Sequence, residues 1–104
     1  MNPQATAKTR SLADLKSVGK ASLADFRLLG VNSVAALAAA DPRELYERLC
    51  RLQGVTVDIC QYDLFCCAVA QARDPHLPPE QRDWFWWSRR RKTRNATRTD
   101  GAED

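Results

Sequence analysis

Five residues near the N-terminus have the types and spacing needed to hold a phosphate group: Lys16, Ser17, Gly19, Lys20 and Ser22. If a helix begins at Lys20, its first backbone N–H groups have no partner inside the helix and carry a partial positive charge. Gly19 suits a tight turn before that helix, because glycine adopts positive φ without steric cost. The N–H groups of this turn, the Ser22 hydroxyl and the two lysines could then surround a phosphate. Such contacts would bind a nucleic-acid backbone without reading its bases.

A second group of cations lies near the C-terminus, directly after the aromatic residues 84–87. Its candidate binding residues are Arg89, Arg90, Arg91, Lys92 and Arg94. Arginines on a flexible segment can neutralise phosphates and release counterions, and aromatic rings can stack on exposed bases. Three other interpretations stay open: tryptophans that close the core, a solvated tail, and contact with an anionic membrane surface.

The remaining polar and sulfur-containing residues predict neither catalysis nor a metal site. The four cysteines form no Cys-x-x-Cys pair and match no zinc spacing, so we expect buried, reduced thiols. The single histidine, His76, lies in a proline-rich loop and is a poor general base. Asp58 suits the start of a helix and Asp63 a solvent-facing position better than a catalytic pair. We therefore expect no enzyme and no cofactor.

Length and charge set the scale of the molecule. A chain of 104 residues with a net charge of +3 fits one domain. We expect a disordered lead-in over 1–10, a helical domain over 11–88, and a flexible tail over 89–104 that is first basic and then acidic. The chain has no stretch long and apolar enough to span a bilayer, and its start lacks the apolar core of a secretion signal. We therefore expect a cytoplasmic protein.

Start and stop signals predict an all-α bundle of five or six helices. Ser11, Ser33 and Asp41 can cap helix starts, while Gly30 and Gly54 can end helices. The patterns predict a short helix that ends near residue 16, helices over about 20–29, 34–40, 42–53 and 58–72, and a short last helix from 79 that includes 84–87. The apolar segment 64–70 predicts a central, buried helix. The inward-facing positions expected on the second and fourth helices are Ala21, Leu23, Phe26, Leu28, Leu29, Leu45, Tyr46, Leu49 and Leu52.

Residues 15–31 resemble the helix-hairpin-helix superfamily. Most of 11–72 resembles a small bacterial family known as the pathogenicity-locus proteins, some of them labelled mitomycin-resistance proteins. The residues that carry this likeness are 18–21, 28–31, 33–34, 41–42, 44–50, Gly54, Asp58, Cys60 and 67–69. The resemblance implies an all-helical, SAM-like fold similar to the C-terminal domain of TfoX competence regulators. The turn departs from the usual motif, because Lys16 stands in place of proline and Ser17 in place of glycine or asparagine.

The hairpin and the basic tail favour the same polyanionic partner. We expect sequence-independent binding of DNA or RNA without catalysis. The alternative is a protein-interaction module, or a self-associating one, in which the hairpin is only a scaffold.

Overall fold

The computed structural model describes residues 10–102, with side chains described up to residue 94. Over this part of the chain it contains five α-helices, two 3₁₀ turns and no strand. In chain order the elements are η1 (Leu12–Asp14), α2 (Lys20–Leu28), α3 (Val34–Ala38), α4 (Pro42–Gln53), α5 (Cys60–Arg73), η2 (Pro79–Arg82) and α6 (Trp84–Ala102). The predicted all-α class is confirmed. None of the helices within residues 10–102 has both the length and the hydropathy needed to cross a membrane.

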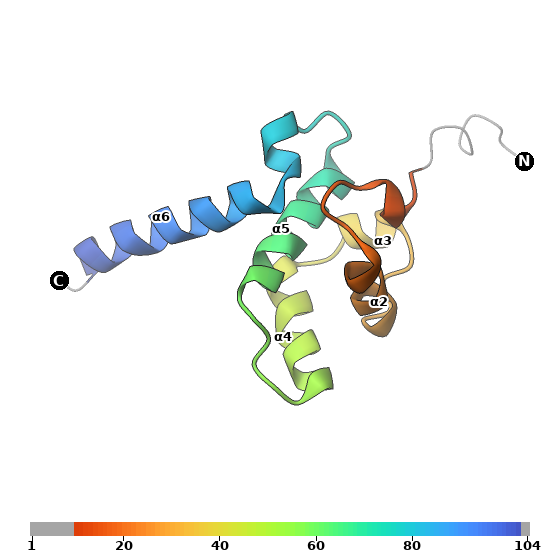
Figure 1. Ribbon diagram of the computed structural model, residues 1–104, viewed down its shortest axis with the longest axis horizontal. Coiled ribbons are helices and arrows are strands. Elements are labelled where there is room, and N and C mark those ends of the chain that lie inside the picture. Colours follow the sequence, from red (N-terminus) through yellow and green to blue (C-terminus); the bar gives the residue numbers. More distant parts are fainter. Residues whose placement is uncertain (1–9, 103–104) are drawn as a thin grey trace, which may run out of the picture.

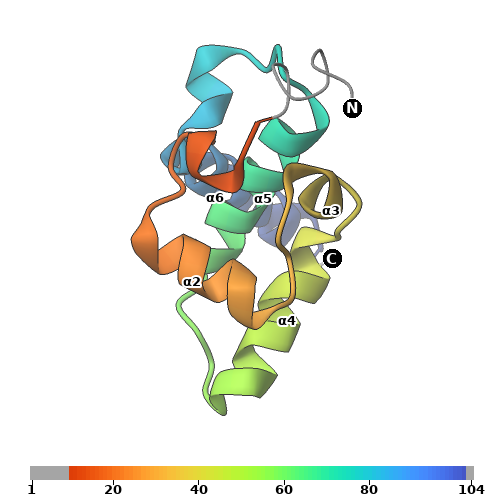
Figure 2. The same ribbon diagram turned by 90° about the vertical axis from the view of Figure 1, so that its right-hand side faces the viewer.

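Helix α5 is the centre of the molecule. Figures 1 and 2 show α2 and α3 on one side of α5 and α6 leaving from the other side. Phe65, Cys67, Ala68 and Val69 of α5 are buried, as the apolar segment 64–70 predicted. The Phe65 ring packs against the ring of Phe26 from α2, with 5.5 Å between their centroids. The helices therefore share one hydrophobic core, and α5 contributes buried side chains to it from several sides.

The predicted caps of the middle helices are present. The Ser33 hydroxyl accepts a hydrogen bond from the N–H three residues later, at 3.0 Å. The Asp41 carboxylate accepts one from the N–H two residues later, also at 3.0 Å, and Pro42 is the first residue of α4. Gly54 ends α4 with φ 71°, in the left-handed region that favours glycine. The Asp58 carboxylate accepts a hydrogen bond from the N–H two residues later at 2.9 Å, so its predicted place at a helix start is confirmed.

Some of the predicted inward positions are wrong. Ala21 is exposed, and the side chains of Leu28 and Leu52 are 52% and 55% exposed. Leu28 is two positions after buried Phe26, and two helical positions turn a side chain to the opposite face. Leu52 lies in the last turn of α4, which extends past the end of the core (Figure 1).

The expected short first helix is a 3₁₀ turn that ends two residues before the predicted end near residue 16. Only the 3₁₀ turn η1 forms, and the backbone is already extended at Leu15, with φ −76° and ψ 136°. The side chain of buried Gln71 explains this ending. Its Oε1 accepts a hydrogen bond from the Lys16 N–H at 3.0 Å, and its Nε2 donates one to the Lys16 carbonyl at 2.8 Å. A residue of α5 thus binds the backbone groups that a longer helix would have paired.

The C-terminal part of the chain also differs from the prediction. The expected short helix is two elements, η2 and α6, and α6 continues through residues 89–102 where a flexible tail was expected. At about 1.5 Å per residue, the 19 residues of α6 extend about 28 Å, well beyond the bundle (Figure 1). Residues 1–9 of the expected lead-in lie outside the described residues. Its last residue, Arg10, donates hydrogen bonds to the carbonyls of Gln71 and Ala72 at 2.9 and 3.2 Å.

Candidate functional site

The turn before α2 has a different backbone geometry from the one predicted. Gly19 has φ −103° and ψ −167°, an extended conformation that other residues also adopt. The positive φ, 74°, falls on Ser17, which is the residue that replaces the glycine or asparagine of the usual motif. The expectation of positive φ at Gly19 is therefore wrong. The backbone strain of this turn lies at a serine, for which the left-handed region is costly.

The Ser17 side chain faces the protein and not the solvent. Its hydroxyl donates a hydrogen bond to the Arg82 carbonyl and accepts one from the Trp84 N–H, both at 3.1 Å. The turn is thereby joined to the start of α6. Ser22 is buried, whereas Lys16, Gly19 and Lys20 are exposed. Of the residues predicted to form the hairpin site, these three remain accessible to a ligand.

Arg91, one of the predicted phosphate-binding residues, forms a buried ion pair within the fold. Its Nε and Nη2 donate hydrogen bonds to the two carboxylate oxygens of Asp63, at 2.8 and 3.0 Å. Asp63 is 1% exposed, so its expected solvent-facing position is wrong. The hydrogen bonds to Asp63 raise the pKa of Arg91 above its ordinary value. This pair attaches the second turn of α6 to α5.

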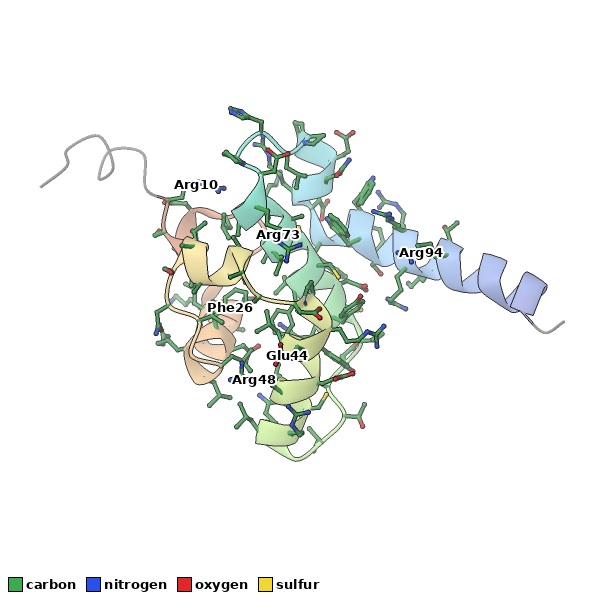
Figure 3. All side chains as sticks on the ribbon, turned by 180° about the vertical axis from the view of Figure 1, so that it is seen from behind. Arg10, Phe26, Glu44, Arg48, Arg73 and Arg94 are labelled. Atoms are coloured by element: carbon green, nitrogen blue, oxygen red, sulfur yellow. The ribbon has the colours of Figure 1, made fainter. Side chains whose placement is uncertain are left out.

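The other cations of α6 up to residue 94 form two stripes. Residues three, four and seven positions apart lie on the same side of a helix. Arg89 and Lys92 share an exposed outer stripe with Phe85, and the Arg89 guanidinium lies 4.9 Å from the centre of the Phe85 ring. Arg90 and Arg94 belong to the other stripe, together with Trp87 and Arg91. Figure 3 shows Arg94 on the part of α6 that leaves the bundle.

The second stripe forms one wall of a pocket between α4, α5 and α6. The pocket encloses about 290 Å³. Its cationic lining consists of Arg43 from α4 and Arg90, Arg91 and Arg94 from α6. With Glu47 and Asp63 as the acids of the lining, the pocket has four positive and two negative side chains. The lining therefore carries a net positive charge.

Aromatic rings hold two of these arginines in place. The Arg43 guanidinium lies 5.5 Å from the centre of the Tyr62 ring, and that of Arg90 lies 5.7 Å from the Trp87 ring. Tyr46 packs edge-on against Tyr62, with 6.1 Å between their ring centres. All three rings line the pocket, so it offers flat apolar surfaces beside the positive groups.

Only Cys67 of the four cysteines is fully buried, so the expectation of buried thiols is wrong for Cys50, Cys60 and Cys66, which are partly buried. Cys66 lies in the pocket wall and Cys67 is buried in the core. Burial raises the pKa of both thiols, that of Cys67 to about 11. Both thiols are therefore protonated near neutral pH, and a protonated thiol is a poor nucleophile and a poor metal ligand.

The sequence predicted binding residues on the α6 side of this pocket and none on the side formed by α4 and α5. The sequence pattern singled out neither Arg43 of α4 nor Tyr62 of α5. A signal was present in the spacing of 87, 90, 91 and 94, which is the spacing of one helix face. The spacing does not show which helices that face meets.

The fold and the pocket define a small all-helical protein with a basic, aromatic pocket at the base of a projecting C-terminal helix. The chain belongs to the Cdd1 pathogenicity-locus family, whose model matches residues 5–93, and the predicted family is confirmed. It is similar to the mitomycin resistance protein McrB of Streptomyces lavendulae, with 36% identity over 81 residues that cover 78% of this chain and 73% of that protein. No solved structure matches the chain. The likeness to helix-hairpin-helix proteins and to TfoX stays a prediction.

Proposed function

We propose that the protein binds nucleic acid without sequence specificity, mainly through the cationic side chains of α6. The observation that carries the proposal is the position of the arginines over aromatic rings of their own helix. Arg89 lies over Phe85, and Arg90 lies over both Trp86 and Trp87. Guanidinium groups held in this way lose less conformational freedom when they bind a phosphate.

The turn before α2 supplies a second, smaller contact in this proposal. The Ser17 hydroxyl joins the turn to the Trp84 N–H at the start of α6. The exposed Lys16 and Lys20 and the first N–H groups of α2 therefore belong to the same end of the molecule as the beginning of α6. One nucleic-acid backbone could contact the turn and the helix together, and both contacts are electrostatic and independent of base identity.

The test is the fluorescence anisotropy of labelled oligonucleotides, titrated with the protein between about 50 and 200 mM salt. Each phosphate contact should contribute a slope of about 0.9 for duplex DNA, or 0.7 for a single strand, to the logarithmic salt dependence. The double variant Arg89→Gln/Lys92→Gln should lower that slope by about 1.8 for duplex DNA or about 1.4 for a single strand. No binding at the lowest salt would refute the proposal.

Two exposed arginines outside α6 provide a matched control. Arg27→Gln/Arg51→Gln removes the same amount of charge from α2 and α4. The control variant should keep most of the salt slope. An equal loss in both double variants would mean that only net charge matters and that α6 has no special role.

A protein partner or a homodimer is the second candidate. Among the side chains of residues 10–94, five large apolar ones are at least 41% exposed: Leu28, Leu52, Val55, Ile59 and Phe85. Binding through such residues would change little with salt, unlike binding to phosphates. Light scattering at increasing protein concentration tests self-association, and a constant monomer mass would argue against a homodimer.

A further inference from the structure

We propose that the pocket between α4, α5 and α6 receives one unpaired nucleotide of a single strand, so that the protein prefers single-stranded to duplex nucleic acid. This inference rests on the proposed function and specifies the site and the substrate class. The inference is based on three kinds of group that line the same pocket: positively charged guanidiniums, aromatic rings and apolar side chains.

The size of the pocket limits what enters it. A volume of about 290 Å³ lies at the lower end of the range for small-ligand pockets, about 300–1,000 Å³. A pocket of this size has room for one nucleotide and not for a helical duplex. A paired base stays stacked inside a duplex and reaches a concave site only after it is extruded, at a cost of a few kcal/mol. An unpaired nucleotide avoids most of that cost.

The charges of the pocket favour a phosphate. Asp63 is already bound by Arg91, so Glu47 is the other acid that faces the remaining arginines of the lining. Arg43 approaches from α4, while Arg90 and Arg94 approach from α6. Guanidiniums from two helices can together bind the oxygens of one phosphate.

The rings favour a base next to that phosphate. Bases of single strands stack on aromatic rings or on guanidinium planes, and every base has such a face. The Arg43 guanidinium lies over the Tyr62 ring, 5.5 Å from its centre, and Trp87 lies on the α6 side of the pocket. Stacking of this kind tolerates any base, in agreement with sequence-independent binding.

The experiment compares labelled oligothymidylate, oligouridylate and a blunt DNA duplex of equal length by fluorescence anisotropy. Arg43→Gln should weaken binding of the single strands about tenfold and binding of the duplex less than about twofold, since one charged hydrogen bond corresponds to about a factor of ten. The matched control is Arg51→Gln, which removes the same charge from an exposed position of α4 outside the pocket. It should change single-strand and duplex binding equally and slightly. A stronger effect on either oligothymidylate or oligouridylate supports the proposal and shows which of the two strands depends more on the pocket.

A second pair of variants separates the contribution of the Tyr62 ring to binding from that of its hydroxyl group. Tyr62→Leu should weaken single-strand binding about tenfold, because stacking of one base contributes about 1–3 kcal/mol, whereas Tyr62→Phe should retain it. Thymidine monophosphate should displace the labelled strand at lower concentration than inorganic phosphate does. Circular dichroism of each variant checks that the fold is intact.

Two results would overturn the inference. If the Gln variants of Arg43 and Arg51 behave alike, or if the duplex binds as tightly as the single strands while thymidine monophosphate fails to compete, the pocket is not a nucleotide site. Salt-dependent binding that persists in that case leaves the proposed function standing. If the wild-type protein binds none of these nucleic acids, both the proposed function and this inference are overturned.

Discussion

The ion pair between Asp63 and Arg91 should be a main attachment of α6 to the bundle. The two side chains are 28 positions apart in the sequence and form two hydrogen bonds, at 2.8 and 3.0 Å. Asp63 is 1% exposed and Arg91 is 19% exposed. We expect Arg91→Gln to be the more damaging single change, because it leaves a buried carboxylate without its charged partner.

The burial of each side chain determines how much its substitution lowers the free energy of unfolding. Breaking a buried pair from one side costs about 3–5 kcal/mol, and Arg91→Gln should fall in this range. Asp63→Asn should cost less, about 2 kcal/mol, because the partly exposed guanidinium of Arg91 can still reach water. The double variant, which leaves no buried charge at this position, should be less destabilised than the sum of the two, by at least about 1.5 kcal/mol.

Urea unfolding followed by tryptophan fluorescence measures these free energies. Trp84, Trp86 and Trp87 all lie in the first turn of α6, so the signal also reports whether this helix stays attached. Arg89→Gln on the outer stripe is the control and should change stability by less than about 0.5 kcal/mol. A coupling energy below about 0.5 kcal/mol between Asp63 and Arg91, or equal losses for Arg91→Gln and Arg89→Gln, would refute the reasoning.

Two further predictions concern Ser17 and Cys67. Ser17→Ala should cost about 2 kcal/mol because two hydrogen bonds are lost, while Ser17→Gly should cost about 1 kcal/mol less because glycine relieves the φ of 74°. Urea midpoints that rank glycine at or below alanine would contradict this order. Burial raises the pKa of the Cys67 thiol from 9.0 to about 11, so the unfolded chain ionises first and stability falls as the pH rises between these values, by about 2.7 kcal/mol. The stability difference between wild type and Cys67→Ala should be constant below about pH 9 and shrink toward pH 11, and a difference that stays flat over that range would contradict the assignment.

The helix boundaries that the sequence predicted well all depend on local chemistry. Ser33, Asp41 and Gly54 act on backbone groups within a few positions of themselves, so their effect is visible in a short stretch of sequence. The first helix was predicted too long because a residue of α5, Gln71, binds the backbone of Lys16. No local pattern contains that partner.

In the candidate site, too, the sequence predicted the local features and not the contacts between distant residues. The cationic and aromatic character of α6 was evident from residues 84–94, and so were the lysines near Gly19. The assignment of Arg91 to phosphate binding missed its buried partner Asp63, which lies in another helix. The packing of α4 against α5 places Arg43 and Tyr62 in the lining of the same pocket as Arg90, and that arrangement was not predicted.

The sequence by itself determined the all-α class, most helix ends and the family, because capping residues, apolar periodicity and motif residues act over short distances along the chain. Only the tertiary structure decided how the polar groups are used. It placed the positive φ at Ser17 in place of Gly19, buried Asp63 beneath Arg91, and closed a pocket between α4 and α6. These outcomes depend on which side chains meet across the bundle, and packing around α5 brings together residues that are far apart in the sequence.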